Sequence, residues 1–235
     1  MSSYMATRDG NRGLCTNSCR WKYAVVEETR PGQYFPVEED ETGTYMFNSQ
    51  DLCAIELVDQ IVKAGVTSFK IEGRTKGLLY GATTAKTYRA AIQSIESGNF
   101  EFQPQWREEL NSVAYRGYTQ GFFNGKLQEP KDASSSALPL GQKELIAIVK
   151  SVRKPFEYKL AVRNQIKVGA MVEAVRPGEP TRKSLIANII DEATGESRDV
   201  ANPNQTIIAT MDLNLEPDDL LRQAIRDGGL PDCRR

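Results

Sequence analysis

The segment LCAIELVDQIVKAGVTSFKIEGR, residues 52–74, contains the pattern that decides the fold. Its first part repeats apolar side chains at the three- and four-residue spacing of an amphipathic helix, and Ala64-Gly65 ends that helix. Its second part, Val66–Ile71, is rich in β-branched residues and predicts a strand, which Glu72-Gly73-Arg74 closes as a turn. We therefore expect a helix that leads directly into a strand.

The flanking sequence repeats this pattern. A short apolar strand is predicted over Tyr45–Asn48, with Ser49 or Asp51 as the helix N-cap, and a second helix over Leu79–Glu96. Strand-helix-strand-helix is typical of a parallel α/β fold. Two such units cannot close a barrel, so the chain is expected to hold only the last two strand-helix units of a (β/α) TIM-type barrel and to enter that domain in its middle.

The C-terminal part has a different sequence pattern, in which short predicted strands are separated by turn residues at regular spacing. These strands are predicted over Lys143–Val152, Glu157–Val162, Met171–Val175, Ser184–Ile190 and Gln205–Met211. Such a series is typical of a small antiparallel barrel or sandwich, and Leu220–Arg226 is expected to close it with a turn of helix. The fold class is thus α/β plus β: a partial barrel with a cysteine loop over residues 1–130, a linker over 131–142, and a small antiparallel β-barrel domain over 143–235.

Composition excludes several classes of function. The 235 residues are 40% apolar and 26% charged, as in ordinary globular proteins, and the formal net charge of −1 gives no global basic field that would indicate nucleic-acid binding. No apolar run is long enough to span a bilayer and no signal-peptide pattern follows Met1, so the expected location is the cytoplasm, with no membrane partner. Histidine is absent, which excludes Ser-His-Asp or Cys-His catalysis and His-ligated zinc if the chain works alone.

Two of the four cysteines, Cys15 and Cys19, lie four positions apart on a glycine-containing segment. In a chain without secretory features this spacing favours a metal or cluster site over a disulfide. Soft thiolate ligands on a loop suit an iron–sulfur cluster. Cys53 is expected to pack as a small buried apolar residue, and Cys233 lies in the C-terminal tail.

Charged side chains follow the second predicted strand. Lys70, Glu72 and Arg74 lie near its C-terminal end, where parallel barrels place their active-site groups. Together they could bind an anionic substrate or perform acid–base catalysis; the alternative is an ion-pair network that fixes the turn. Asn48 and Asp51 occupy the matching position after the preceding strand, as substrate-binding candidates or as a helix cap.

Two further segments are candidates for contact with nucleic acid. Arg20, Trp21 and Lys22 stand beside the cysteines and could form part of a basic patch. The aromatic run Tyr115–Phe123 could stack on bases, although such aromatic residues more often pack one domain against another.

Three blocks of sequence together carry a resemblance to a known family. They are NRGLCTNSCRWKY at residues 11–23, FNSQDLC at 47–53, and SFKIEGRTK at 68–76 followed by YRAAI at 88–92. In this order and spacing the chain resembles the peptidase U-32 family of collagenase-like peptidases over residues 2–222. Its features are most similar to the branch that hydroxylates the wobble uridine of certain tRNAs.

The resemblance implies a longer protein with an N-terminal (β/α) barrel, most of which this chain lacks. It implies an iron–sulfur cluster held by four cysteines, two of which match Cys15 and Cys19, so the cluster is expected to be incomplete or absent in this chain alone. The implied partners are tRNA and either a complementing barrel fragment or further copies of the chain. Three functions remain open: tRNA hydroxylation, proteolysis without recognised protease machinery, and a non-catalytic fragment whose β-domain binds a partner.

Overall fold

The computed structural model describes residues 50–74, 76–98, 100–115, 117–125 and 141–225, together with short pieces between residues 6 and 45. The chain divides into two compact units, each made of two segments. The first unit joins Met1–Cys53 to Tyr115–Pro139, and the second joins Ala54–Ala114 to Leu140–Arg235. Each unit is treated by itself below.

The described part of the first unit consists of short strand pairs. The antiparallel pairs are β1 (Val25–Val26) with β2 (Tyr34–Phe35) and β3 (Glu38–Asp40) with β4 (Gly43–Tyr45). The parallel pair is β5 (Asp51–Leu52) with β6 (Tyr118–Thr119). Parallel pairing among the described residues is limited to this one pair, so the TIM-type barrel stays a prediction.

The helices belong to the second unit. They are the 3-10 helix η3 (Ile55–Leu57), α2 (Val58–Lys63), α3 (Leu78–Glu96) and α4 (Pro104–Ser112). The predicted helix over Leu79–Glu96 is confirmed as α3, whose buried residues recur at helical spacing from Leu79 to Ala91. Pro104 stands in the first turn of α4, where its missing N–H costs nothing. Gly65 has φ 92° directly after α2, a left-handed conformation that favours glycine at a helix end.

The predicted strand over Val66–Ile71 is wrong for the described residues. The segment has no strand assignment, and most of its side chains are exposed. A β-branched sequence can be extended, but a strand needs a neighbouring strand to satisfy its backbone N–H and C=O groups. The described part of the second unit provides no such neighbour for this segment. The other predicted strand, Tyr45–Asn48, begins at the last residue of β4, and residues 46–49 lie outside the described residues.

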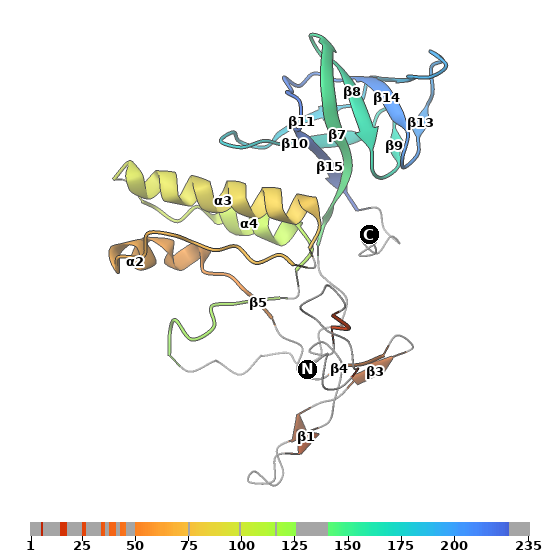
Figure 1. The fold of residues 1–235 in the computed structure, drawn as a ribbon. Helices are drawn as coiled ribbons and strands as arrows, with labels where there is room; N and C mark the ends of the chain where they lie inside the picture. Colours follow the sequence, from red (N-terminus) through yellow and green to blue (C-terminus); the bar gives the residue numbers. More distant parts are fainter. Residues whose placement is uncertain are drawn as a thin grey trace. The chain divides into compact units, whose positions relative to one another are not determined.

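A seven-stranded antiparallel sheet makes up the rest of the second unit (Figure 1). In sheet order its strands are β11 (Arg182–Leu185), β10 (Met171–Val175), β15 (Leu220–Ala224), β7 (Lys143–Lys154), β8 (Glu157–Val162), β14 (Thr206–Thr210) and β12 (Asn188–Asp191). A separate pair joins β9 (Ile166–Lys167) to β13 (Val200–Ala201). Four of the five predicted C-terminal strands are therefore confirmed, and β8 and β10 have the predicted bounds. The fifth, Ser184–Ile190, is wrong as a single strand, because the chain forms two strands there, β11 and β12.

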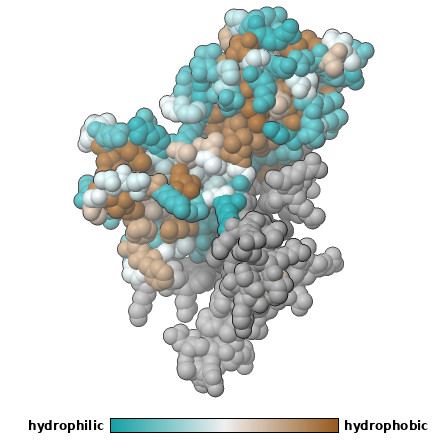
Figure 2. All heavy atoms as spheres, in the orientation of Figure 1, coloured by the Kyte–Doolittle hydropathy of each residue, from teal (hydrophilic) through white to brown (hydrophobic). Residues whose placement is uncertain are grey.

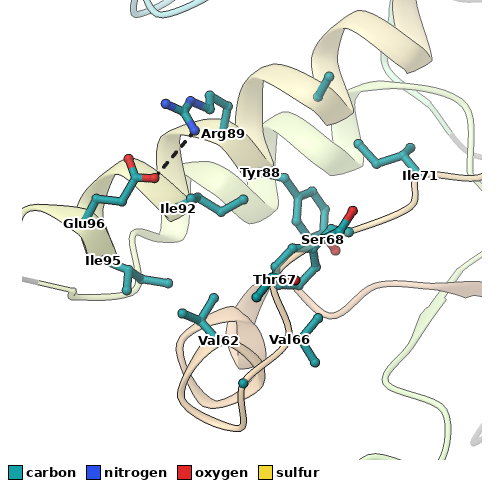
Figure 3. A pocket seen from close by; sticks show the side chains of 13 residues that line it. Val62, Val66, Thr67, Ser68, Ile71, Tyr88, Arg89, Ile92, Ile95 and Glu96 are labelled. Atoms are coloured by element: carbon teal, nitrogen blue, oxygen red, sulfur yellow. Dashed lines mark ion pairs between the residues drawn. The ribbon is translucent and has the colours of Figure 1, made fainter.

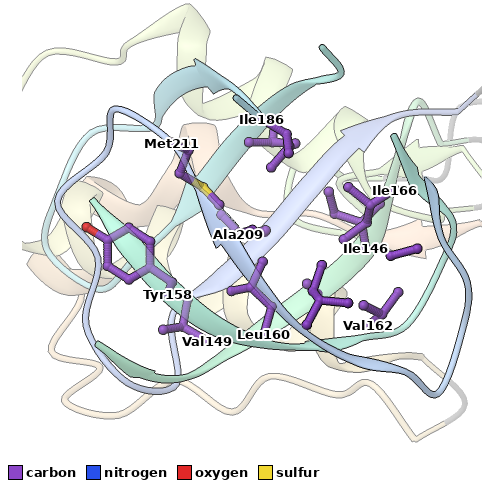
Figure 4. Close-up of a cluster of buried hydrophobic side chains, with 14 of the residues drawn as sticks. Ile146, Val149, Tyr158, Leu160, Val162, Ile166, Ile186, Ala209 and Met211 are labelled. Carbon is purple, nitrogen blue, oxygen red and sulfur yellow. The ribbon is translucent and has the colours of Figure 1, made fainter. Parts of the chain in front are cut away.

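The sheet is curled, so that its two edge strands come close together. These edge strands, β11 and β12, are consecutive in the chain. Between β11 and β12, the N–H of Ile186 donates to the carbonyl of Ala170 (3.0 Å) and the N–H of Ala187 donates to the carbonyl of Thr210 (2.8 Å). The chain thus passes from one edge of the sheet to the other. The concave side holds a core of apolar residues that includes Tyr158 and Leu160 (Figure 4). Alternate residues of β8 supply part of it, as the period-two rule for strands predicts.

The predicted turn of helix over Leu220–Arg226 is wrong, because this segment forms β15. The strand lies between β10 and β7 and pairs with both. Its residues Leu220–Gln223 are all buried, so the segment lacks the alternation of a half-exposed strand. Leu79 of α3 joins Ile148, Val175 and Leu220 in a small apolar cluster, which packs the helical segment against the sheet.

Candidate functional site

A pocket of about 640 Å³ lies between the end of α2, residues 65–71 and one face of α3 (Figure 3). Apolar side chains line much of it, among them Val66, Ile71 and Ile92. Figure 3 shows Tyr88 lying between α3 and the segment that carries Thr67 and Ser68. The hydroxyl of Tyr88 accepts a hydrogen bond from the N–H of Ala54 at 3.0 Å, which fixes the ring at the pocket wall. Figure 2 shows apolar side chains among hydrophilic ones on the surface of this helical segment.

The predicted site residues Lys70 and Glu72 lie on the segment that borders this pocket. Lys70 Nζ is 2.7 Å from Glu72 Oε1, and the two side chains are 85% and 69% exposed. The hydrogen bond from Lys70 and its positive charge lower the pKa of Glu72, and Arg74 adds a smaller effect; the same bond raises the pKa of Lys70. Glu72 is therefore ionised at neutral pH. So exposed an ion pair stabilises a fold very little.

Tyr80 and Lys76 hold the C-terminal end of this segment. A Cβ atom on Gly73 would lie 3.0 Å from Cε1 of Tyr80, so the absence of a side chain at Gly73 lets the ring approach closely. Lys76 Nζ lies 5.1 Å from the centre of the same ring and donates to the carbonyl of Ala114 at 2.9 Å. The loop that presents Lys70 and Glu72 is thus anchored to α3 although it belongs to no sheet.

The other predicted substrate-binding residues are distributed differently. Asp51 belongs to the first unit and lies in β5, where its N–H donates to the carbonyl of Gly117 at 2.9 Å. The helix-cap alternative for Asp51 is wrong, because the caps of η3 and α2 are Ala54 and Leu57, which make no side-chain cap bond. Asn48 and Arg20 lie outside the described residues.

Of the two predicted cluster ligands, Cys15 is described and exposed, with its Sγ 3.9 Å from Oδ1 of Asn17. Cys19 lies outside the described residues. Among the residues that the structure describes, no group of three or more His, Cys, Asp or Glu side chains could hold a metal ion. An iron–sulfur cluster usually takes four protein ligands, so this part of the chain does not form a complete site. Cys53 is buried, as expected for a small apolar residue.

The aromatic run in the first unit is partly paired and partly exposed. The rings of Tyr115 and Tyr118 stack with their centres 4.4 Å apart. Phe122 and Phe123 are exposed, at 74% and 54%. These exposed rings keep both interpretations of the run open, stacking on bases and contact with another domain.

A buried cluster of charges, which the sequence did not predict, connects α4 to the sheet. Arg222 on β15 donates from Nε to Glu173 Oε2 at 2.9 Å, from Nη1 to Ser112 Oγ at 3.0 Å, and from Nη2 to Glu109 Oε1 at 3.0 Å. Lys143 adds a second bond to Glu173 at 2.8 Å. We call these five residues the Arg222 cluster.

The electrostatics of the Arg222 cluster are strongly perturbed. Burial raises the pKa of Glu173, but the hydrogen bond from Lys143 and the charges of Arg222 and Lys143 outweigh it and lower the pKa to about 2. Nearby, burial lowers the pKa of Lys86, whose Nζ donates to Thr181 Oγ1 at 2.9 Å. One sequence signal could have indicated the cluster: Glu173 stands inside an otherwise apolar strand, MVEAV.

Comparisons with known proteins match the chain in two consecutive segments. The family model for peptidase family U32 matches residues 1–133, and the model for the peptidase family U32 C-terminal domain matches residues 142–222. Two crystal structures of the C-terminal domain of a putative U32 peptidase from Geobacillus thermoleovorans are 24% and 22% identical to this chain. They cover 34% and 35% of this chain and 99% and 93% of their own, with TM-scores of 0.31 and 0.32.

Curated relatives carry two kinds of name. The tRNA hydroxylation protein P of Escherichia coli K12 is 32% identical, covering 86% of this chain and 52% of that protein. The tRNA hydroxylation protein P1 of Bacillus subtilis is 28% identical, covering 95% and 53%. A collagenase of Porphyromonas gingivalis is 30% identical, covering 54% and 30%. The chain thus spans about half the length of the E. coli and B. subtilis relatives.

No described helix is long and apolar enough to cross a membrane. Since the two family models together match most of the sequence, the chain belongs to peptidase family U32.

Proposed function

We propose that this chain is part of a tRNA-modifying protein that hydroxylates a uridine of tRNA. One observation carries the proposal: relatives named tRNA hydroxylation proteins are similar over 86% and 95% of the chain, whereas the collagenase is similar over 54%. These two hydroxylation relatives therefore share nearly the whole chain, whereas the proteins of the same name from Haemophilus influenzae and Helicobacter pylori match 52% of it.

The segment at residues 66–74 supplies the site in this proposal. Lys70 and Arg74 meet the phosphates of the RNA, and the ionised Glu72 accepts a hydrogen bond or a proton from the substrate. Two features support this: both charges of the Lys70–Glu72 pair are exposed, and the loop that carries them is held against α3. Asp51, Asn48 and Arg20 are the further substrate-binding candidates.

A complementing barrel fragment is the partner that this proposal requires. Val66 and Ile71 are about two-fifths exposed at the pocket, and the segment between them has no strand partner in the described part of its unit. Strands of the remaining half of a TIM-type barrel would pair with this segment and cover the pocket. Such pairing would put Lys70, Glu72 and Arg74 at the C-terminal end of a barrel strand. The alternative partner is another copy of the chain.

The iron–sulfur cluster belongs to the complete protein in this proposal. Cys15 and Cys19 would provide two thiolate ligands, and the complementing fragment would provide the others. Bound there, the cluster would supply redox chemistry. Lys70, Glu72 and Arg74 would bind and orient the RNA.

A chimera tests the proposal. In the E. coli tRNA hydroxylation protein P, the matching half is replaced by this chain, and the chimera is expressed in a strain that lacks the native protein. Mass spectrometry of its tRNA is expected to show hydroxylated uridine. Cys15→Ala should abolish the modification and the bound iron, whereas Cys53→Ala, a matched control at a buried cysteine, should preserve both. A folded chimera that binds iron but leaves the tRNA unmodified would refute the proposal.

Proteolysis is the second candidate function, because the similarity to a collagenase includes half of the chain. The same purified chimera is therefore incubated with gelatin. Gelatin cleavage that is lost in Glu72→Gln, without tRNA modification, would favour the peptidase. Loss of both activities in a folded protein would leave a non-catalytic fragment whose β-domain binds a partner.

A further inference from the structure

In the hairpin that joins β7 to β8, β7 extends past its other neighbour, β15, whereas β8 stays paired with β14 (Figure 1). On one side of β7, pairing with β15 ends at Ile148, and two bonds between Val149 and residues 218–219 are the last contacts there. On the other side, pairing with β8 continues to Lys154. Residues 150–154 of β7 therefore have a strand partner on one edge only among the residues that the structure describes.

Two β-bulges interrupt β7 in this hairpin, and both insert a cation. The register shifts between Val149 and Ser151 and again between Val152 and Lys154, which leaves Lys150 and Arg153 as the inserted residues. A bulge redirects side chains and is common where a strand presents them for binding. Both side chains are exposed.

Neither inserted cation is neutralised within the described part of the chain, where no carboxylate lies within ion-pair distance of Lys150 or Arg153. The other cations of the hairpin do have acidic partners. Lys154 is 3.1 Å from Glu157, and Lys159 is 2.5 Å from Glu192. The hairpin thus presents uncompensated positive charge, although the whole chain has a net charge of −1.

An aromatic ring occupies the tip of the hairpin in an unfavourable backbone conformation. Phe156 follows Pro155 in the turn and has φ 65°, where glycine or asparagine is the usual residue. Its carbonyl accepts a hydrogen bond from the N–H of Met211 at 3.0 Å, which anchors the backbone, while 47% of the residue stays exposed. Val152, 45% exposed, adds apolar surface to the hairpin. The turn therefore contains a residue in a strained backbone conformation, and its aromatic ring is partly exposed and is not part of the apolar core.

We propose that residues 150–156 form an RNA-binding hairpin, in which Lys150 and Arg153 contact backbone phosphates and Phe156 stacks on an unpaired base. Cations beside an exposed ring match the two chemical features of an RNA strand, its phosphates and the flat faces of its bases. The inference rests on the proposed function, because it assigns tRNA as the occupant. It adds a contact in the C-terminal domain, which is separate from the segment at residues 66–74.

Fluorescence anisotropy of the full chain with labelled unfractionated tRNA, over a series of KCl concentrations, tests the proposal. Lys150→Ala/Arg153→Ala should lower the salt slope of log affinity by about 1.4, because each lost phosphate contact of a single strand accounts for about 0.7. Phe156→Asn suits the positive φ and should fold, yet should weaken binding by about 5- to 150-fold, the fold-change equivalent to one stacked base, with an unchanged salt slope.

A matched control removes two exposed cations elsewhere on the sheet. Arg182 lies on β11, three strands from β7 in the sheet order, and Arg198 follows β12. Arg182→Ala/Arg198→Ala has the same net charge as the hairpin double variant and should bind tRNA within two-fold of the wild type.

Several results would overturn the hairpin proposal. The proposal is wrong if the wild-type chain does not bind tRNA, if the hairpin variants bind tRNA as tightly as the wild type, or if the Arg182→Ala/Arg198→Ala control loses as much affinity for tRNA as the hairpin double variant. If Lys150→Ala/Arg153→Ala aggregates while its monomer binds tRNA normally, the cations only protect an exposed strand edge. Binding to phosphatidylserine vesicles that depends on these residues and exceeds tRNA binding would point to a membrane surface instead. The chimera assay decides the hydroxylation proposal separately, since loss of modification with intact tRNA binding refutes that function alone.

Discussion

Replacing Arg222 with methionine should destabilise the second unit strongly. Arg222 is 3% exposed and its guanidinium bonds Glu173, Ser112 and Glu109. Removing one partner of a buried ion pair costs about 3–5 kcal/mol because the remaining charge is left uncompensated. Glu173 would keep Lys143 at 2.8 Å and Lys183 at 3.2 Å, so we expect the lower end, about 3 kcal/mol. That loss corresponds to a fall in melting temperature of about 6–12 °C for a unit of this size.

Urea unfolding followed by far-UV circular dichroism gives the free energy of unfolding of each variant. The control is Arg182→Met, which removes an arginine that is 60% exposed on β11. Arg222→Met/Glu173→Met should lose less stability than the sum of the two single variants, because neither charge is then left without the other; the expected coupling is about 1–3 kcal/mol. Hydrogen exchange in α4 should accelerate in Arg222→Met, since Glu109 and Ser112 lose their bonds to the sheet. A loss below about 1 kcal/mol, no larger than the control, would refute the assignment of Arg222 as the residue that connects α4 to the sheet.

Three further predictions follow from the site and the Arg222 cluster. The pKa of Glu173 is lowered from 4.5 to about 2, so its contribution of about 3 kcal/mol should be fully present above pH 4.5 and lost as the pH falls toward 2. Urea unfolding between pH 5 and 2 measures this loss, and Glu173→Gln should show a smaller pH dependence. Glu72→Gln in the chimera should abolish tRNA hydroxylation with a nearly unchanged melting temperature, because its ion pair with Lys70 is exposed; retained activity with a large fall in stability would indicate a structural role. After anaerobic reconstitution, the chain alone should bind iron weakly and below one cluster per chain, and a full four-iron cluster lost in Cys15→Ala would contradict the expectation that ligands are missing.

The spacing of apolar residues predicted those helices and strands whose own sequence carries a clear periodicity. In β8, the buried residues Tyr158, Leu160 and Val162 alternate with partly exposed ones, and the strand formed as predicted. The long helix α3 and most C-terminal strands were predicted for the same reason. Val66–Ile71 was predicted wrongly because a strand depends on a neighbour that its own sequence does not contain. Leu220–Arg226 was predicted wrongly because burial of both faces of β15 removes the alternation that identifies a strand.

In the candidate site, too, a contact between residues close in the sequence could be predicted, whereas contacts between distant residues could not. Lys70 and Glu72 are two residues apart, and their ion pair could be expected from the sequence alone. Glu173 in its apolar strand could have indicated a buried charge, but its partners in the Arg222 cluster could not be predicted, because the hydrogen bond between Arg222 and Glu109 joins residues 113 positions apart. The exposed ring of Phe156 was also missed, since a positive φ at a non-glycine residue leaves no mark in the sequence.

The position of β15 in the sheet has a consequence for synthesis on the ribosome. This strand is the last one described in the chain, yet it lies between β10 and β7 and pairs with both. A nascent chain that ends before Leu220 would therefore hold two partial sheets, with the edges of β7 and β10 unpaired. The complete sheet can form only after the final strand has left the exit tunnel. Folding of this sheet therefore has to wait for β15, and a chain that lost this strand would expose two strand edges that can pair with other chains.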